Sequence, residues 1–287
     1  TQDDRLAEEF SDDLKLLAGE EAVAFFPDFE VLPYEERSPH YIIRSERIKT
    51  LSDILTGNTK IFCMSVRNLL QSITPKNVLK EYVVKLKQNV EFDMSELIAI
   101  LVDSGYENEF QVVKPGQISK RGGIIDVFSP NYPKPLRLEF FGDEICSIRT
   151  FNIETQRSEP NELTEALLIP ARELILSKVN PDSPLKEKTA LKGFYEGIEQ
   201  DTPLLYKSQS TILDYFEPTE TAIFWDNILT LDQVASEIIE ESSNLWAKSK
   251  KEKKKRVIAD PDQIFMTPDR LKKISSLFPN HFIASAV

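Results

Sequence analysis

The start of the chain carries apolar residues at the three- to four-residue spacing of an amphipathic helix. In residues 2–17 the repeating positions are Leu6, Phe10, Leu14 and Leu17. Thr1 is the candidate N-cap of this helix, because a threonine hydroxyl accepts a hydrogen bond from a free amide of the first turn. We interpret residues 42–55 as a second helix.

Short, uninterrupted apolar runs at residues 22–26 and 61–65 predict two buried strands. A loop bounded by prolines, residues 27–39, separates the first run from the second helix. Strands that alternate with helices are typical of a parallel sheet covered on both faces. The start of the chain therefore predicts an α/β domain.

The pattern changes at residues 74–75, and the next segment predicts a different kind of domain. Residues 81–88 indicate a strand, and Asp93 begins a capping box for a helix that ends at Gly105. Three or four strands follow up to Phe151. Several strands after one helix favour an α+β domain with an antiparallel sheet, inserted into the first domain.

The chain is expected to return to the first domain near residues 168–170. An apolar strand at residues 222–225, a helix from Leu231 and an α/β portion at residues 262–287 then follow. A length of 287 residues agrees with two domains. The predicted segments are residues 1–74 and 170–287 for the outer domain and residues 75–169 for the inserted domain.

The most informative stretch lies in the inserted domain, where residues 122–128 and 136–144 read as consecutive antiparallel strands. Side chains alternate between the two faces of a strand. The alternation places Leu136, Leu138 and Phe140 on one face and Arg137, Glu139 and Phe141 on the face toward water. An exposed phenylalanine beside an arginine is a candidate partner site.

Arg121 comes just before the first of these strands. It joins the same patch if the pair Gly122-Gly123 bends or bulges the chain at that point. The alternative is a half-buried sheet with ordinary surface charges, and the residues alone leave both interpretations open.

Composition narrows the kinds of function. The chain has 47 acidic and 35 basic residues, and its formal net charge of −12 repels phosphate backbones rather than concentrating them. One exception is the run of residues 248–256, in which seven of nine residues are basic. We interpret this run as a solvated helix end, because cations suit the negative end of the helix dipole.

Nothing in the sequence predicts a metal, a cofactor or a membrane span. His40 and His281 lack the spacing of metal ligands, and no run of 18 apolar residues occurs. Cys63 and Cys146 lie in apolar, strand-like runs and are expected to be buried thiols in a reducing cytoplasm. Thr1 in place of an initiator methionine predicts a fragment of a longer protein.

Several separate stretches, in the right order, resemble the excision-repair protein UvrB and the transcription-repair coupling factor (Mfd) family. The shared stretches are Arg121-Gly122-Gly123-Ile124-Ile125-Asp126-Val127-Phe128, residues 136–145, Thr155-Gln156-Arg157-Ser158, Gly197-Ile198-Glu199 and Leu213-Asp214-Tyr215-Phe216. Residues 27–34, with Ser38-Pro39-His40, are similar to the N-terminal region of the coupling-factor family.

The resemblance implies a fold, a partner and its contacts. The implied fold is a degenerate helicase-like (P-loop-type) parallel-sheet α/β domain, interrupted by a smaller α+β domain that binds the repair protein UvrA. By motif position, the UvrA contacts fall on Arg121, Arg137 and Phe141. These are the residues that strand alternation and the Gly-Gly pair had already grouped.

The resemblance also implies the role of the longer protein. In that family a separate ATP-dependent translocase portion pushes stalled RNA polymerase off damaged DNA, and this region then recruits UvrA by presenting the surface that UvrB presents. RNA polymerase and DNA are contacted by other domains. A C-terminal domain of the same protein masks the UvrA site, and the implied location is the bacterial cytoplasm.

A working motor of this type needs a glycine-rich loop ending in Gly-Lys-Ser/Thr and an acidic pair after an apolar strand. The first motif does not occur in this sequence. At the second, the predicted strand at residues 222–225 is followed by Asp226 and Asn227. Because asparagine cannot accept a proton from water, we interpret this pair as a degenerate nucleotide motif, and we predict no catalytic residues.

Three classes of function compete at this point. An adaptor module that recruits UvrA accounts for all the motifs. The alternative, a fragment of UvrB itself, is disfavoured by Asn227, by residues 27–40, and by the lack of room between Tyr34 and Ile61 for the long aromatic hairpin with which UvrB clamps DNA. The third class, a structural domain that binds nucleic acid, conflicts with the net charge of −12.

Overall fold

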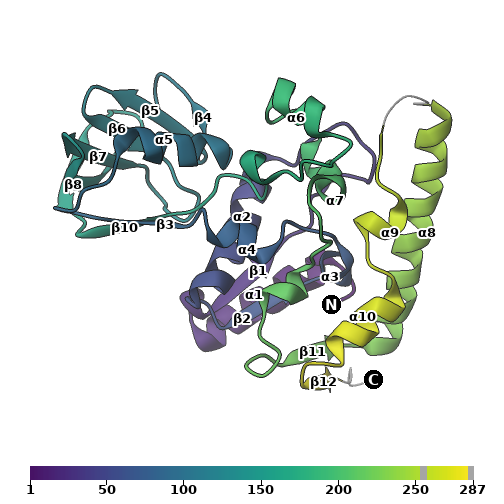
Figure 1. The fold of residues 1–287 in the computed structure, drawn as a ribbon. Coiled ribbons are helices and arrows are strands. Elements are labelled where there is room, and N and C mark those ends of the chain that lie inside the picture. Colours follow the sequence, from purple (N-terminus) through teal and green to yellow (C-terminus); the bar gives the residue numbers. More distant parts are fainter. Residues whose placement is uncertain (253–256, 284–287) are drawn as a thin grey trace. The chain divides into compact units, whose positions relative to one another are not determined.

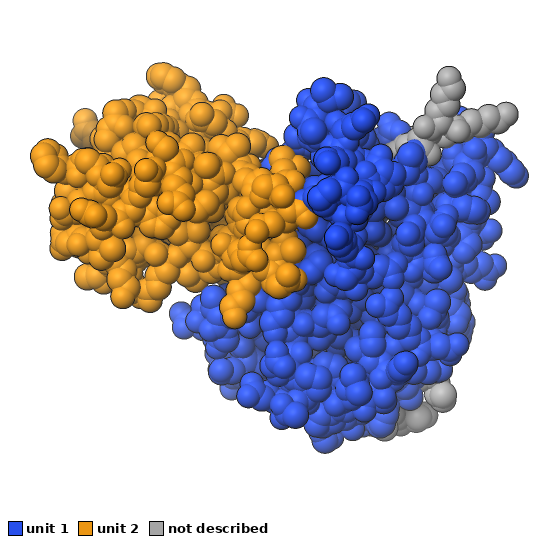
Figure 2. All heavy atoms as spheres, in the orientation of Figure 1, with its two compact units in different colours: residues 1–43, 53–76, 179–287 blue, residues 44–52, 77–178 orange. Residues whose placement is uncertain are grey.

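The computed structural model describes residues 1–252 and 257–283, and the chain forms two compact units. Unit 1 holds residues 1–43, 53–76 and 179–287, and unit 2 holds residues 44–52 and 77–178 (Figure 2). The inserted domain that we predict at residues 75–169 lies almost wholly in unit 2. Unit 2 also takes in the middle of helix α2 (Tyr41–Thr56) and the segment up to residue 178.

Unit 1 contains two parallel pairs of strands (Figure 1). β1 (Val23–Phe26) pairs with β2 (Ile61–Met64), and β11 (Ile223–Asp226) pairs with β12 (Asn280–Ile283). The predicted parallel pairing and the two early strands are confirmed. In each pair the strands are far apart in sequence, because parallel neighbours need a long crossover connection. The finer helicase-like description stays a prediction.

Unit 1 also contains several helices. They are α1 (Asp4–Ala18), α3 (Val66–Leu70), α6 (Lys186–Lys192), α7 (Thr202–Leu205), α8 (Ile228–Glu252), α9 (Pro261–Ile264) and α10 (Pro268–Ser275), with 3-10 turns at Glu20–Ala22, Ile198–Asp201 and Ile212–Tyr215. The predicted second helix is confirmed as α2, while the helix expected from Leu231 begins three residues earlier, at Ile228.

The start of α1 corrects the predicted N-cap. The carboxylate of Asp3 accepts the Leu6 amide at 2.9 Å, so Asp3 and not Thr1 caps the helix. α1 packs against β1 and β2 and buries Ala7 and Ser11, whereas Leu17 at its far end is exposed. The predicted apolar face was therefore wrong at its last position.

Unit 2 is an α+β unit whose main sheet has six strands in the order β4-β5-β6-β7-β8-β9. The strands are β4 (Glu107–Asn108), β5 (Gln117–Arg121), β6 (Ile124–Val127), β7 (Leu136–Phe141), β8 (Glu144–Phe151) and β9 (Ser158–Glu162). β5 to β9 are antiparallel neighbours, which confirms the predicted antiparallel sheet. A second, two-stranded antiparallel sheet joins β3 (Val84–Lys87) to β10 (Glu165–Leu168). The 77–178 segment of unit 2 begins in α4 (Lys76–Lys80) and ends with a 3-10 turn at Leu176–Lys178.

One face of the six-stranded sheet is covered by helix α5 (Met94–Asp103). The Asp93 carboxylate accepts the Ser95 and Glu96 amides at 2.7 and 2.8 Å, which confirms the predicted helix start. Leu97 and Leu101, one turn apart on α5, belong to the same buried cluster as the inward-facing residues of the sheet. Those residues are Ile118, Ile125, Val127, Leu136, Leu138, Ile145 and Ile148. The other face of the sheet carries the candidate site.

Candidate functional site

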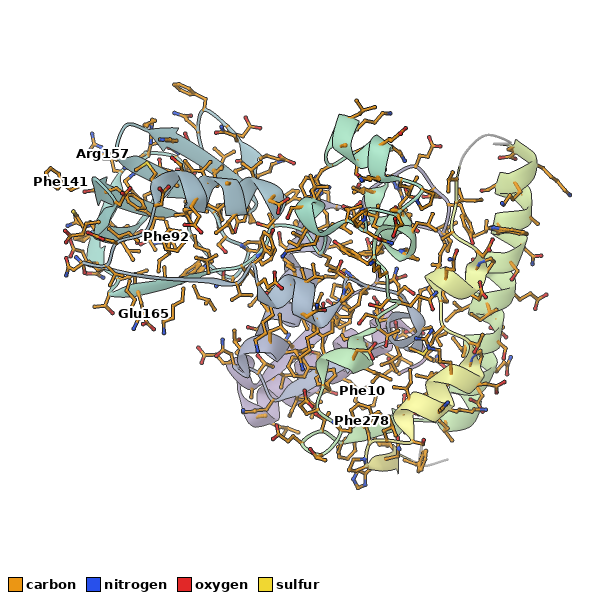
Figure 3. All side chains as sticks on the ribbon, viewed as in Figure 1. Phe10, Phe92, Phe141, Arg157, Glu165 and Phe278 are labelled. Carbon is orange, nitrogen blue, oxygen red and sulfur yellow. The ribbon has the colours of Figure 1, made fainter. Side chains whose placement is uncertain are left out.

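The two faces of β7 are divided as the sequence predicts. Leu136 and Leu138 are fully buried and Phe140 packs against the same core, whereas the Phe141 side chain is 82% exposed. Because an exposed phenylalanine contributes nothing to the core of this unit, Phe141 is available to a partner. Figure 3 shows its ring projecting from the outline of unit 2.

An irregularity in β8 lies beside Phe141. Glu139 pairs with Ser147, but the next residue, Phe140, pairs with Ile145, so β8 carries Cys146 as an extra residue. The bulge turns Cys146 outward, and its side chain is exposed, while Cys63 in β2 is buried. The prediction of two buried thiols is therefore wrong for Cys146, because alternation within β8 is interrupted there.

The pair Gly122-Gly123 is a hairpin turn between β5 and β6 rather than the first residues of a strand. Gly122 has φ of +60°, which glycine adopts without strain. A Cβ atom on Gly123 would lie 2.8 Å from the Phe140 carbonyl oxygen, so no larger residue fits beside β7. The turn ends β5 at Arg121, which pairs with Ile124 and shares the outer face of the sheet with Asp126.

Asp126 joins the two predicted arginines. Its carboxylate, 1% exposed, accepts Arg137 Nε at 2.7 Å and Arg137 Nη2 at 2.9 Å, a bidentate pair. Arg121 Nη2 forms an ion pair with the same carboxylate. The structure thus brings Arg121 and Arg137 together, from strands on either side of β6, through one buried acid.

Arg137 is also held from its other side. Its Nη1 donates to the Gln156 carbonyl at 3.1 Å and to Ser158 Oγ at 3.3 Å, and its guanidinium lies 4.7 Å from the centre of the Phe151 ring. The hydrogen bonds that Arg137 donates to the Asp126 carboxylate raise the pKa of Arg137, so it stays charged. With its side chain only 12% exposed, Arg137 is mainly engaged inside unit 2.

Arg121 and Phe141 differ from Arg137 in this respect. The Arg121 side chain is 42% exposed, and its contact with Asp126 involves one terminal nitrogen. A guanidinium has five N–H donors, so Arg121 keeps donors that face solvent. Of the three predicted contact residues, Arg121 and Phe141 present accessible surface, and Arg137 holds in place Asp126, the acid that also pairs with Arg121.

Asp126 is the residue that sequence reasoning missed. The sequence did carry a signal for it, because aspartate is disfavoured inside strands and Asp126 interrupts the apolar run Ile124-Ile125-Asp126-Val127. Its partner could not be read from that signal, because the register that sets Asp126 opposite Arg137 depends on the connection between β6 and β7.

The two residues that we predict to be a degenerate nucleotide motif lie in unit 1. Asp226 ends β11, and Asn227, with φ of +51°, forms the junction to α8. The Asn227 carbonyl accepts the amides of Thr230 and Leu231 at 3.0 and 3.2 Å, so this residue starts the helix. Its observed contacts are structural.

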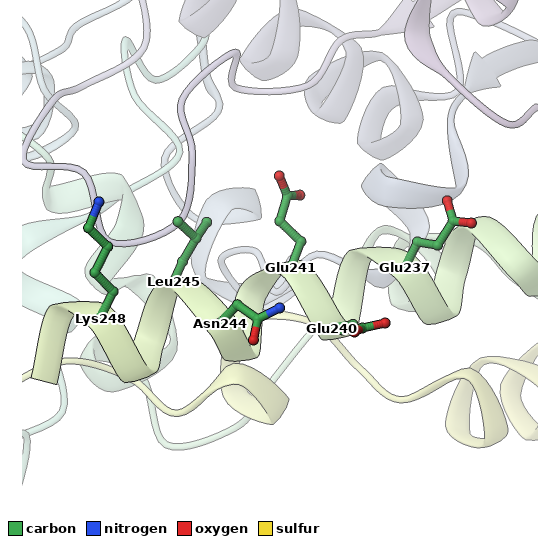
Figure 4. Close-up of a pocket in the computed structure, with 6 residues that line it drawn as sticks. All are labelled: Glu237, Glu240, Glu241, Asn244, Leu245 and Lys248. Atoms are coloured by element: carbon green, nitrogen blue, oxygen red, sulfur yellow. The ribbon is translucent and has the colours of Figure 1, made fainter.

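A shallow pocket of about 450 Å³ runs along α8 (Figure 4). Its lining consists of Glu237, Glu240, Glu241, Asn244, Leu245 and Lys248. Three carboxylates against one ammonium make it a poor site for phosphates. The predicted basic run begins at Lys248 in the last turns of α8, and its residues 253–256 lie outside the described residues.

The described residues also bear on metals and membranes. Across residues 1–252 and 257–283, no group of three His, Cys, Asp or Glu side chains is placed as metal ligands are. No helix in the same ranges is both long and apolar enough to cross a bilayer.

The fold and the site define a two-unit α/β protein whose α+β unit presents an arginine- and phenylalanine-bearing sheet face. Residues 84–174, inside that unit, match the sequence family described as the UvrB interaction domain. The match spans β3 to β10 and includes Arg121, Asp126, Arg137 and Phe141.

Most of the chain is similar to transcription-repair-coupling factors. It is 33% identical to that of Myxococcus xanthus over 83% of this chain, and 32% identical to that of Rickettsia typhi over 78%. The coupling factor of Haemophilus influenzae is 28% identical over 97% of this chain. The chain spans 21 to 25% of the length of these three relatives. The predicted resemblance to the UvrB-homology region of this family is confirmed.

Proposed function

We propose that this chain is a non-catalytic adaptor of transcription-coupled nucleotide excision repair that recruits UvrA by presenting the surface with which UvrB binds it. The observation that carries the proposal is Phe141, exposed on the same family-matched sheet face as Arg121. Aromatic and arginine side chains are the residues that most often dominate binding energy in protein interfaces. No covalent chemistry is required of such a module.

The longer protein, as the coupling-factor resemblance implies, carries an ATP-dependent translocase that acts on RNA polymerase and DNA through other domains. In this proposal a C-terminal domain of that protein covers the Phe141 face until UvrA is needed. A chain without that domain binds UvrA constitutively.

The alternative, a fragment of UvrB, is not favoured. The coupling-factor relatives align over most of this chain, and residues 27–40 form a loop followed directly by α2. Asn227, where a motor requires a second acid, is used to start α8.

A binding titration of the 287-residue chain against purified UvrA, with and without UvrB, tests the proposal. We expect saturable binding that UvrB displaces, because both proteins use the same face of UvrA. Binding that is unchanged by excess UvrB would refute mimicry, and absence of any binding would refute the adaptor function.

We expect the purified chain not to hydrolyse ATP, with or without double-stranded DNA. The sequence has no Gly-Lys-Ser/Thr loop to hold the phosphates, and Asn227 cannot act as the base that a second acid supplies. Phosphate release measured against a no-protein blank checks this. Turnover that DNA stimulates above the blank would contradict the adaptor proposal.

We also expect the basic run at residues 248–256 to be dispensable for UvrA binding. Its described residues end α8, in unit 1, and they are no part of the sheet face that carries Phe141. Replacing four of its lysines by glutamine should leave the UvrA dissociation constant within about twofold, since charges remote from a partner contribute little to affinity. Loss of the complex in a variant that still melts normally would place the partner site elsewhere.

A further inference from the structure

The connection between β8 and β9, residues 152–157, is a tightly built loop. Asn152 Oδ1 accepts the amides of Glu154 and Thr155, each at 2.9 Å, and the Asn152 carbonyl accepts the Gln156 amide at 2.8 Å. Gln156 has φ of +58°, a conformation that a non-glycine residue rarely adopts. The loop therefore presents the next residue, Arg157, from a fixed backbone.

Arg137 ties this loop to the candidate site. It donates to the carbonyl of Gln156 and to the hydroxyl of Ser158, the residues on either side of Arg157. Gln156 Nε2 donates to the Val112 carbonyl at 3.4 Å, which fixes the loop to a second segment of unit 2. Arg157 is thus placed at the margin of the surface that holds Arg121 and Asp126.

Arg157 itself is exposed and forms no ion pair with any described residue. The acids of the adjoining strand are already engaged. Glu159 pairs with Lys134 and accepts the Thr150 hydroxyl at 2.7 Å, and Glu162 pairs with Arg149. Arg157 is therefore held on a fixed loop, beside two acids that are already paired, without an ion pair to any described residue of unit 2.

We propose that Arg157 is a further contact of the partner surface and that its guanidinium pairs with a carboxylate of UvrA. This inference rests on the proposed function. A planar guanidinium matches a carboxylate through two parallel hydrogen bonds, and the fixed loop lowers the entropy lost on binding. Figure 3 shows the Arg157 side chain, like that of Phe141, projecting from unit 2.

The test compares Arg157→Ala and Arg157→Glu with wild type in titrations of the full chain against purified UvrA. We expect Arg157→Ala to weaken binding by about tenfold and Arg157→Glu to weaken it further, because the reversed charge faces an acid. Both losses should shrink as salt is raised. Melting temperatures should change little, because the Arg157 side chain is exposed and forms no ion pair with a described residue.

Lys120→Glu is the matched control, since strand alternation puts Lys120 on the other face of β5 from Arg121, and its binding should stay near wild type. Phe141→Ala, measured in the same series, separates the two hypotheses. If Phe141→Ala loses binding and Arg157→Glu stays within about twofold of wild type, the role of Arg157 is refuted and the adaptor function stands. If the wild-type chain does not bind UvrA, both are refuted.

Discussion

Phe141→Ala is expected to weaken UvrA binding by roughly thirtyfold or more, which corresponds to about 2 kcal/mol. The ring is 82% exposed on β7, so its apolar surface is buried only when a partner covers it. For the same reason the melting temperature should not fall. Affinity by titration and melting by calorimetry, on the same preparation, give the two quantities.

Phe224→Ala is the matched control for this prediction. Phe224, in β11 of unit 1, is also largely exposed, and its ring stacks on that of His281. Its removal should leave UvrA affinity near wild type. If Phe141→Ala and Phe224→Ala behave alike, general loss of apolar surface and not a specific anchor explains the result.

Arg137→Ala is expected to destabilise unit 2 by about 3 kcal/mol or more. It leaves the Asp126 carboxylate, 1% exposed, with Arg121 as its remaining ion pair, and it removes the cation stacked on Phe151. For a unit of this size that loss lowers the melting temperature by about 10 °C or more. From the sequence, Arg137 is expected to be a UvrA contact whose loss changes the stability of the fold little. Because the Arg137 side chain is largely buried, we now expect a large loss of stability.

Arg149→Ala provides the comparison for Arg137→Ala. Arg149 lies directly opposite Arg137 on β8, yet its ion pair with Glu162 is solvent-exposed on both sides, so its loss should alter melting little. The double variant Asp126→Asn/Arg137→Gln should recover part of the stability lost in Arg137→Ala, because no buried charge is left alone. Melting of Arg137→Ala at the wild-type temperature would contradict the role assigned to the pair.

Phe141→Ala and Arg137→Ala are expected to weaken UvrA binding for two different reasons. Phe141→Ala removes contact surface, so binding falls without a change in the fold. Arg137→Ala withdraws support from Arg121 and from the loop that presents Arg157. Binding measured well below the melting temperature should therefore fall for Arg137→Ala too, and raising the temperature should widen its deficit but not that of Phe141→Ala.

The sequence by itself determined the features that follow from local backbone geometry. Side-chain alternation along β7 put Leu138 in the core and Phe141 in solvent, and the capping pattern at Asp93 marked the start of α5. These predictions succeeded because a strand reverses its faces at every residue and a helix leaves its first amides free, whatever the rest of the fold does. The motifs, read in order, also gave the resemblance to the coupling-factor family.

Only the tertiary structure decided which of these residues meet. The β5–β6 turn and the register of β6 against β7 set Arg121 and Arg137 on one carboxylate, and the bulge in β8 turned Cys146 outward. Strand register depends on turns and on packing between segments far apart in sequence, and a shift of one residue would reverse every face. Periodicity within one strand therefore predicted that Arg137 faces outward. The fold as a whole decided that the 152–157 loop covers Arg137 and that the same loop presents Arg157 to solvent.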